Sequence, residues 1–281
     1  MDIARSSFYY QPKEPDTADV KADMDILDRI ETICLDFHGY GYRRVTRQLH
    51  YDGFQVNHKR VLRLMRESDL LCRIKRKWVR TTDSNHGLPI FRNLIKDRQI
   101  TGINQVWLAD ITYIRIRHGF VYLAAILDAF SRKVIGHAIS RSMDTKLVLE
   151  ALNMAIANRN PCSGIIHHSD RGVQYASLDY VGKLKEHGFE VSMSGKGNPY
   201  DNATMESFFK TLKQEEVYLF EYETITDVQS RLPYFIEQVY NLKRLHSSIG
   251  YLSPVTYEEM VTQQQNKEET RQLVLTCSVQ S

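Results

Sequence analysis

Three carboxylates in the second half of this 281-residue chain are placed where they can do chemistry together. Asp110 interrupts the β-branched and aromatic run 106–116, Asp170 follows a short apolar run, and Glu206 belongs to a helical pattern. Two acids at the ends of adjacent strands and a third from a covering helix can converge on one point. Carboxylate oxygens, with no His or Cys requirement, suit Mg²⁺ or Mn²⁺ rather than zinc. Two such ions about 4 Å apart would activate an attacking oxygen and stabilise the leaving one in phosphoryl transfer.

Asp110 and Asp170 also have purely structural explanations. An ionised acid within a central strand is costly unless it is paired, and Asp110 could pair with Arg115 or Arg117. Asp170 could instead cap the turn at residues 171–172, a common role for Asp. The residues alone leave these roles open beside the catalytic one.

A fourth acid and two histidines lie close to the same predicted strands. Asp128 ends the second strand, where we favour a capping role or an ion pair with Arg132. His167 and His168 come just before Asp170. Because Mg²⁺ prefers oxygen ligands, we interpret both histidines as hydrogen-bonded residues at the edge of the sheet rather than metal ligands.

The helix that carries Glu206 has two distinct faces. Asn202 is a good N-cap, and the apolar positions that follow recur at i, i+3, i+4 and i+7: Met205, Phe208, Phe209 and Leu212. Glu206, Lys210 and Lys213 share another face at i, i+4 and i+7. The simpler interpretation of that second face is a surface helix with an ordinary Glu–Lys pair, worth a few tenths of a kcal/mol.

The elements around the acids follow the order β-β-β-α-β-α-β-α. The predicted strands and helices run over residues 106–116, 119–130, 133–139, 144–157, 164–170, 178–187, 189–193 and from 202 onward. Short turns join the first three strands, which predicts antiparallel neighbours. Thr226 and Gln229 indicate a capping box for a last helix that reaches about Leu245, with Pro233 near its start or kinking it.

The first part of the chain predicts a small helical region. Amphipathic helices are expected over residues 22–37, 42–50 and 57–68. The third carries a basic stripe of Lys59, Arg60, Arg63 and Arg66. Two helices joined by a short turn, the second with a basic outer face, resemble a helix-turn-helix DNA reader. A helical bundle with a solvated basic side is the alternative.

Composition limits the class of protein. The net charge is only +3, but residues 43–80 hold 12 Lys or Arg against 3 acids, a local excess of 9 that fits a nucleic-acid partner. Its 4 cysteines form no C-x-x-C motif, which argues against a disulfide framework or thiolate zinc site and fits a reducing cytoplasm. The first residues lack a signal-peptide pattern, and no apolar run is long enough to cross a membrane.

Several long motifs resemble one known family. They are W-L-A-D-I-T-Y at 107–113, H-S-D-R-G-V-Q-Y at 168–175, N-P-Y-D-N-A-T-M-E-S-F-F-K-T-L-K at 198–213 and Y-N-L-K-R-L-H-S-S-I-G-Y-L-S-P at 240–254. Asp170 and Glu206 are separated by 35 residues (206 − 170 − 1), and Lys213 follows 7 residues after Glu206. This pattern strongly resembles the second-frame catalytic protein, often called OrfB, of bacterial insertion-sequence transposases of the IS three family. Residues 39–45 and 56–70 match its helical N-terminal region.

The resemblance implies an α/β, ribonuclease-H-like integrase core with a five-stranded mixed sheet. In it, Asp110, Asp170 and Glu206 form a catalytic DDE triad that holds two Mg²⁺ or Mn²⁺ ions. Lys213 and Lys210 would contact DNA, and Asn202 would shape the loop before Glu206. The resemblance further implies DNA partners at the insertion-sequence ends and the target, a homo-oligomer on DNA, and an upstream-frame protein or fusion that supplies an end-binding domain.

The expected domains are a helical, helix-turn-helix-like DNA-binding region at 1–72, a basic and polar linker at 73–100, a catalytic core with a C-terminal helix at 101–262, and a polar tail at 263–281. Two other functions remain open. One is a DNA-binding regulator of the full-length transposase without turnover of its own. The other is a general ribonuclease-H-like nuclease, which would hydrolyse strands without joining them.

Overall fold

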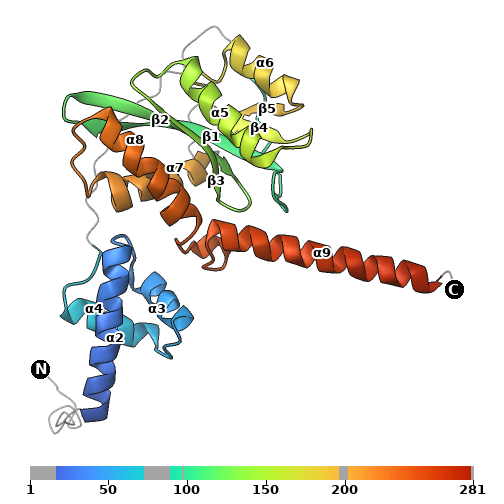
Figure 1. The fold of residues 1–281 in the computed structure, drawn as a ribbon. Helices are drawn as coiled ribbons and strands as arrows, with labels where there is room; N and C mark the ends of the chain where they lie inside the picture. Colours follow the sequence, from blue (N-terminus) through green and yellow to red (C-terminus); the bar gives the residue numbers. More distant parts are fainter. Residues whose placement is uncertain (1–16, 73–88, 97, 196–201, 280–281) are drawn as a thin grey trace, which may run out of the picture. The chain divides into compact units, whose positions relative to one another are not determined.

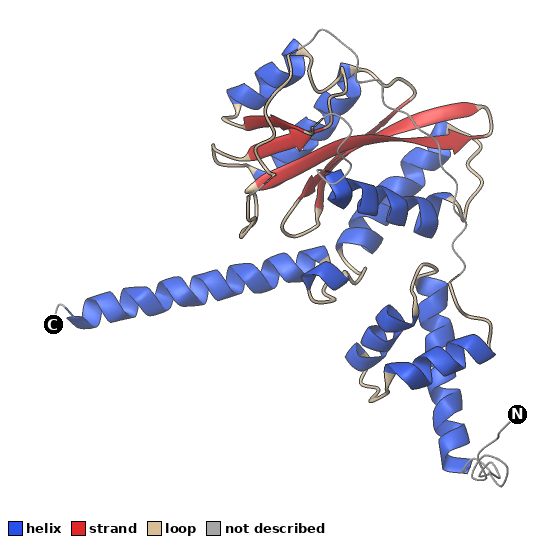
Figure 2. Cartoon of the chain, turned by 180° about the vertical axis from the view of Figure 1, so that it is seen from behind, coloured by secondary structure: helices blue, strands red, loops and turns tan. Residues whose placement is uncertain are grey.

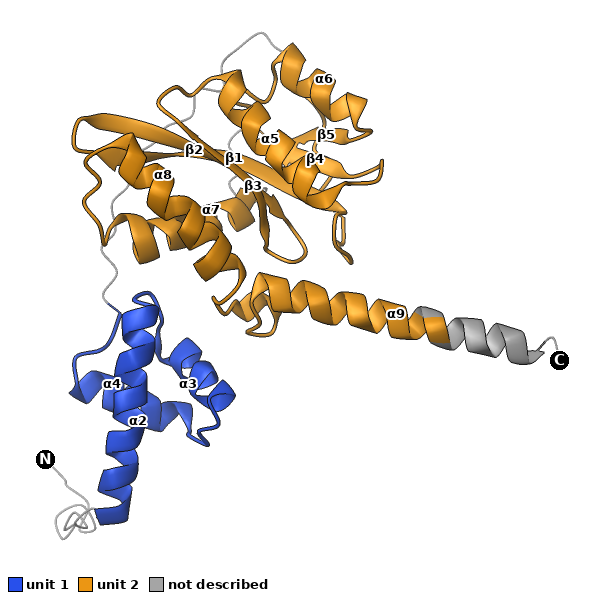
Figure 3. Cartoon of the chain, in the orientation of Figure 1, with its two compact units in different colours: residues 1–73 blue, residues 74–281 orange. Residues whose placement is uncertain are grey.

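The chain folds as two compact units, residues 1–73 and 74–281 (Figure 3). The computed structural model describes residues 17–72, 89–96, 98–195 and 202–279. Most of the predicted linker at 73–100 therefore lies outside the described residues, as does the loop 196–201. Each unit has its own core and is described by itself.

In its described residues, 17–72, unit 1 is a bundle of three helices, as predicted. They are α2 (Thr17–Asp36), α3 (Tyr42–Tyr51) and α4 (His58–Glu67). The predicted cap of α4 is present, because the Asn57 side chain accepts a hydrogen bond from the backbone N–H of Lys59 at 2.8 Å. One apolar stripe from each helix fills the core, with Ile30, Leu49 and Met65 fully buried.

Unit 2 is built on a five-stranded mixed sheet with the order β3-β2-β1-β4-β5 (Figure 1). The strands are β1 (Val106–Ile116), β2 (Gly119–Asp128), β3 (Val134–Ser140), β4 (Ile166–Ser169) and β5 (Glu190–Met193). The first three pair antiparallel, and β1–β4 and β4–β5 pair parallel. Both the predicted element order and the mixed sheet are confirmed.

Helices cover both faces of this sheet. Helices α5 (Thr145–Arg159) and α6 (Leu178–Glu186) lie on one face, and α7 (Ala203–Leu212) and α8 (Ile225–Tyr234) lie on the other (Figures 1 and 2). Because side chains alternate along a strand, β1 contributes Trp107 to the first layer and Leu108 to the second. This alternation decides which helices each residue of β1 faces.

Helix α5 approaches β3 so closely that one position admits only glycine. A Cβ added to Gly136 would lie 2.8 Å from the Ala155 Cβ and closer still to the Ala151 carbonyl oxygen. We expect Gly136→Ala to destabilise unit 2 by about 3 kcal/mol, because backbone on the opposing helix cannot move aside. Gly182→Ala in α6 is the matched control, since nothing lies within 4 Å of its new Cβ. The control should be neutral or slightly stabilising. Urea unfolding would measure both, and equal midpoints would contradict the close approach.

The capping prediction for the helix after the core is wrong by two residues. Thr224 accepts from the Asp227 N–H, and the Asp227 carboxylate accepts from the Thr224 N–H in return, which forms the capping box. Thr226 and Gln229 take no part in it. Pro233 lies near the C-terminal end of α8, which is followed by a π-helical segment, Phe235–Asn241. A proline removes a helical donor, and such a register change is a known way to accommodate it.

This helix is also not the last one. A further helix, α9, runs from Pro254 to Val279 and includes the segment predicted as a polar tail. The described side chains from residue 262 to 268 are exposed. Hydrophobic periodicity could not reveal this helix, because its described side chains beyond the first two turns are exposed.

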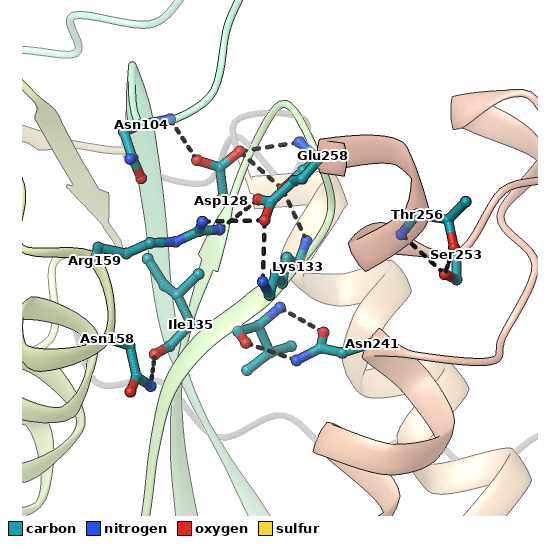
Figure 4. Close-up of polar contacts among 12 residues, drawn as sticks. Asn104, Asp128, Lys133, Ile135, Asn158, Arg159, Asn241, Ser253, Thr256 and Glu258 are labelled. Atoms are coloured by element: carbon teal, nitrogen blue, oxygen red, sulfur yellow. Dashed lines mark hydrogen bonds and ion pairs between the residues drawn. The ribbon is translucent and has the colours of Figure 1, made fainter. Parts of the chain in front are cut away.

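The start of α9 is joined to the core by a buried charged network (Figure 4). Arg159 of α5 donates both of its terminal N–H groups to the Glu258 carboxylate, one at 3.0 Å, and Lys133 donates to the same carboxylate at 3.0 Å. Asn241 bonds both backbone groups of Val134, accepting at 2.9 Å and donating at 2.8 Å. The Y-N-L-K-R-L-H motif therefore has a structural role, because its Asn241 side chain binds the backbone of β3.

Candidate active site

Asp110 and Asp170 are brought to the same level of two neighbouring strands. The parallel pairing of β1 with β4 sets Leu108 opposite His168. Continued by two residues on each strand, this register places Asp110 opposite Asp170, just beyond the end of β4. By the alternation of β1, Asp110 shares the face of Leu108, which α7 covers.

Helix α7 carries Glu206 over this face of the sheet. Its predicted apolar side is buried against the sheet, as shown by the four side chains of Met205, Phe208, Phe209 and Leu212. Glu206 and Lys210 lie on the exposed side of the helix, and Lys213 is half-buried at its end. The helix packing thus explains how Glu206 comes near two strands that lie far from it in sequence.

The charges of the three acids influence one another. Burial and, to a smaller extent, the negative charges of Asp170 and Glu206 raise the pKa of Asp110, which the Ile111 N–H and Lys213 oppose, to a net value of about 8. Asp110 accepts the Ile111 N–H at 2.8 Å. The expected alternative, an ion pair of Asp110 with Arg115 or Arg117, is not observed, because Arg117 pairs with Glu223 at 3.2 Å. Like charges that lie close together away from water repel one another, and a bound cation would remove this repulsion.

Asn202 has a different role from the predicted N-cap. It occupies the position before α7, but its side chain makes no capping hydrogen bond. Its amide nitrogen instead donates to the Asp110 carboxylate at 3.2 Å. The residue is 8% exposed, and its amide oxygen has no hydrogen-bond partner among the described residues. A buried amide oxygen without a partner is costly, so Asn202 presents an open acceptor beside Asp110.

Lys213 lies between the acids and an aromatic ring. Its ammonium is 4.5 Å from the centre of the Tyr113 ring, a cation–π arrangement. Burial lowers its pKa, and the charge of Asp110 acts in the opposite direction. Lys213 therefore borders Asp110, Asp170 and Glu206, which we call the acid cluster, as its spacing from Glu206 predicts.

The remaining candidate acids and histidines have structural partners. The Asp170 carboxylate accepts from the Gly172 N–H at 2.9 Å, so it also has the predicted capping role. Asp128 caps the β2–β3 turn through the Phe130 and Ser131 N–H groups, at 3.0 and 2.9 Å. The proposed ion pair of Asp128 with Arg132 is not formed, because the Arg132 guanidinium donates to Thr204 at 3.0 Å.

His167 and His168 are completely buried, as hydrogen-bonded members of the sheet. The His168 ring contacts the hydroxyls of Ser192 and Ser194 at 2.8 and 3.1 Å. His167 contacts the Tyr180 hydroxyl at 2.9 Å. These contacts support the interpretation of both rings as hydrogen-bonded residues, but β4 lies between β1 and β5, so neither ring is at the edge of the sheet as expected.

Tyr175 belongs to the site but was not predicted. Its side chain is 2% exposed, and its hydroxyl has no hydrogen-bond partner among the described residues. Burial and the neighbouring Tyr180 raise its pKa well above the usual value, and the charges of Asp110 and Asp170 add to the shift. Its place at the end of H-S-D-R-G-V-Q-Y is the signal that could have identified it.

The basic stripe of unit 1 is partly engaged within the unit. Asp23 of α2 accepts hydrogen bonds from both Arg60 and Arg63 at 2.6 Å. Arg63 also contacts Glu67 at 3.0 Å. Lys59 and Arg66 are exposed on α4. Of the four residues of the basic stripe, Arg60 and Arg63 therefore hold α2 against α4, and Lys59 and Arg66 project outward.

The donor atoms of the acid cluster suit a hard divalent cation. All three acids offer carboxylate oxygens, and the open Asn202 oxygen lies beside them, a set that fits Mg²⁺ or Mn²⁺. In the part of the chain described, no three His, Cys, Asp or Glu side chains are already gathered closely enough to hold an ion. Glu206 is exposed, so a rotamer change is open to it. The residues fit a divalent metal held by the acids after such a movement.

The fold and this site define a class of protein. A mixed sheet of this order, helices on both faces, acids on two adjacent strands and a third acid on a covering helix together describe a ribonuclease-H-like integrase core. Comparison with protein families agrees. Models described as "Integrase core domain" match residues 101–199 and 187–254, and one described as "HTH-like domain" matches residues 21–78.

Relatives of known type place the chain more narrowly. It is 39% identical over 244 residues to the transposase for insertion sequence element IS904 of Lactococcus lactis, covering 85% of this chain and 96% of that protein. It is 40% identical over 220 residues to transposase InsF for insertion sequence IS3A of Escherichia coli, covering 78% of this chain and 76% of that protein. The chain belongs to this family of bacterial insertion-sequence transposases.

Solved structures include a simian T-cell lymphotropic virus intasome in complex with a PP2A regulatory subunit. One chain of it matches 78% of this chain and 70% of its own length, with a TM-score of 0.48 and 17% identity.

Among the described residues, no helix is both long and apolar enough to cross a membrane.

Proposed function

We propose that this chain cuts and joins DNA strands by metal-assisted phosphoryl transfer, with Asp110, Asp170 and Glu206 as its DDE triad. The main observation in favour of the proposal is that the charges of Asp170 and Glu206 both act on the Asp110 carboxyl. Burial, Asp170 and Glu206 all raise the pKa of this carboxyl, in a core of the integrase type. A structural acid would be expected to have a cationic partner at this depth.

Each residue of the site has a distinct task in this proposal. The three carboxylates bind two Mg²⁺ or Mn²⁺ ions, which supply Lewis-acid stabilisation of the attacking and leaving oxygens. Asn202 donates to one oxygen of Asp110 and the Ile111 N–H donates to the other, and each carboxylate oxygen keeps a further lone pair for a metal. Helix α7 and the sheet beneath it exclude water from one side of the acids. Water or a DNA 3′-hydroxyl is the attacking group, so no covalent protein intermediate forms.

The positive charges near the site are proposed DNA contacts. Lys213 is next to the acid cluster, and Lys210 is exposed one turn earlier on the same helix. In unit 1, Lys59 and Arg66 project outward. Arg60 and Arg63 would reach DNA only by giving up or sharing Asp23. Phosphate contacts of this kind add affinity and salt dependence rather than sequence preference.

The partners follow from the proposed reaction. We propose that the substrates are insertion-sequence ends and target DNA, that the protein works as a homo-oligomer on DNA, and that an upstream-frame protein or fusion contributes end recognition. The proposed compartment is the cytoplasm. The proposed boundaries remain 1–72, 73–100 and 101–262, followed by 263–281, of which residues 263–279 form part of α9.

Replacing Glu206 with Gln tests the proposal directly. The substitution removes one negative charge from the exposed side of α7 and disturbs no buried contact. We expect a loss of metal-dependent strand cleavage and joining of at least about a thousandfold, because the ions would lose a charged ligand. Circular dichroism should be unchanged, and urea unfolding should show no loss of stability. Glu150→Gln, the same change on the exposed side of α5 and away from the acids, is the matched control and should retain the chemistry.

A further inference from the structure

A strip of aromatic and basic side chains leads away from the acid cluster along β1. Beyond the short pairing with β4, β1 pairs with β2 alone among the residues that the structure describes. The strip comprises Tyr113, Phe120, Lys213 and Tyr218, and we refer to it as the β1-edge strip. Tyr113 is three positions after Asp110, which is about 10 Å along a strand, and by the alternation of β1 it points to the other face, where the Lys213 side chain reaches its ring.

The members of the β1-edge strip contact one another. The rings of Tyr113 and Phe120 meet edge to face with centres 5.3 Å apart. The Lys213 ammonium is 4.5 Å from the Tyr113 ring centre. Burial raises the pKa of Tyr218 and the neighbouring Tyr113 adds to the shift, which shows that these two side chains are also close. The strip is thus continuous, and Lys213 links it to the charge of Asp110.

The segment after α7 is fixed against the β1–β2 hairpin. The Arg117 N–H donates to the Tyr222 carbonyl at 2.9 Å, which places the chain after Tyr218 beside the end of β1. Phe120 and Tyr218 nevertheless remain 51% and 52% exposed. Two large aromatic side chains held at a fixed place and left half in water are unusual for a core and typical of a contact surface.

We propose that the β1-edge strip binds unpaired DNA bases next to the strand that is cut. This inference rests on the proposed function, because it needs a phosphodiester at the acid cluster. A strand bound there must continue across a neighbouring surface, and the strip begins at Lys213, the cation nearest to Asp110. Aromatic faces stack on bases of any sequence, and interleaved cations follow the backbone.

The charge around the strip favours nucleic acid over a second protein chain. Arg115, Arg117 and His118 are exposed at the tip of the β1–β2 hairpin, directly beside Phe120, and Arg117 pairs with Glu223 at 3.2 Å. Basic side chains at the hairpin can contact the phosphates of a nucleic acid, and the aromatic rings beside them can stack on its bases. Bases expose those faces only when they are unpaired, so the strip selects a frayed or single-stranded flank.

The test compares two DNA probes in the Glu206→Gln background, which prevents turnover. One probe is a blunt duplex, and the other is the same duplex with a short unpaired thymidine flank. Fluorescence anisotropy measures their affinities for Phe120→Ala and Tyr218→Ala. We expect each substitution to weaken binding of the flanked probe about tenfold and to leave the blunt duplex unchanged. Tyr234→Ala removes a tyrosine that is 60% exposed on α8, outside the strip, and should change neither affinity.

Three results would overturn the inference. These are an equal loss for both probes, no loss for either, or a change in oligomeric state on gel filtration, which would assign the strip to a protein contact. Cleavage by the unsubstituted protein is measured in parallel on insertion-sequence ends. Active cleavage with an unaltered flank preference in the variants would refute the strip alone. Absent cleavage with a flank preference that depends on Phe120 and Tyr218 would refute the proposed function alone.

Discussion

Asp110→Asn is expected to make the metal-free protein more stable and to abolish its chemistry. The carboxyl of Asp110 has a pKa raised from 3.8 to about 8 by burial and by Asp170 and Glu206. An acid whose pKa is raised in the folded state destabilises that state as the pH rises above the unfolded value. At neutral pH the folded protein must therefore keep a proton on Asp110 or tolerate a buried charge. Asparagine has the same shape and carries no charge.

The size and pH dependence of this gain follow from the same shift. We expect about 2 kcal/mol at pH 7, less than the full shift implies because Asp110 keeps part of its surface in water. The gain should develop between pH 4 and pH 8 and vanish below pH 4, where the unfolded acid is protonated as well. Urea unfolding in EDTA at several pH values measures it. Glu150→Gln, on the exposed side of α5, is a control for the loss of one carboxylate elsewhere.

The same variant should respond differently to metal. Mg²⁺ or Mn²⁺ is expected to raise the midpoint of thermal unfolding of the unsubstituted protein, because binding to the folded state stabilises it. Asp110→Asn should show little of this response and lose strand cleavage by at least about a thousandfold. A variant that is both less stable without metal and still stabilised by metal would show that Asp110 is a structural acid.

Glu258→Gln is expected to cause a large loss of stability in unit 2 without altering a residue of the active site. Glu258 is 7% exposed and accepts from Arg159 and Lys133 (Figure 4). Burial alone would raise the pKa of Glu258, but the hydrogen bonds and charge of Arg159 outweigh it, and the pKa is lowered. Removing one partner of such a pair leaves the remaining cation buried without compensation. We expect a loss of about 3 kcal/mol at pH 7.

The pH dependence of the stability loss distinguishes the loss of the Glu258 charge from a loss of packing. A carboxyl with a lowered pKa stabilises the fold above its unfolded pKa of about 4.5, and this contribution is lost as the pH falls through the folded value. The difference between Glu258→Gln and the unsubstituted protein should therefore shrink at acidic pH. Glu259→Gln alters the next residue, which is exposed, and should have no effect. A pH-independent loss would point to lost packing instead of lost charge.

The sequence was sufficient for the sheet and the order of its elements because burial imposes a period on each of them. The run at 106–116 shows the strand directly, and its bounds agree with β1. The face of α7 followed from the spacing of Met205, Phe208, Phe209 and Leu212, all of which are buried. These features depend on local patterns that one chain displays without help from distant residues.

Pairings between distant side chains could not be predicted in this way. Asn202 has the sequence context of an N-cap, but the carboxylate of Asp110, 92 residues earlier, takes its amide hydrogen. Arg60 and Arg63 look like free surface cations until α2 brings Asp23 between them. The capping box shifted by two residues because Thr224 and Thr226 offer the same local signal, and only tertiary packing decides between them. The position of Tyr175 beside the acids likewise depends on how the turn after β4 folds back.

The central claim is that Asp110, Asp170 and Glu206 act together on a DNA phosphodiester. The most direct measurement is an assay of strand cleavage and joining on labelled oligonucleotides that carry the insertion-sequence ends, with the upstream-frame partner supplied. It compares the unsubstituted protein with Glu206→Gln in Mg²⁺, in Mn²⁺ and in EDTA. The account predicts products that require the metal and disappear with Glu206→Gln while DNA binding persists. Cleavage or joining that proceeds at the same rate in Glu206→Gln would contradict it.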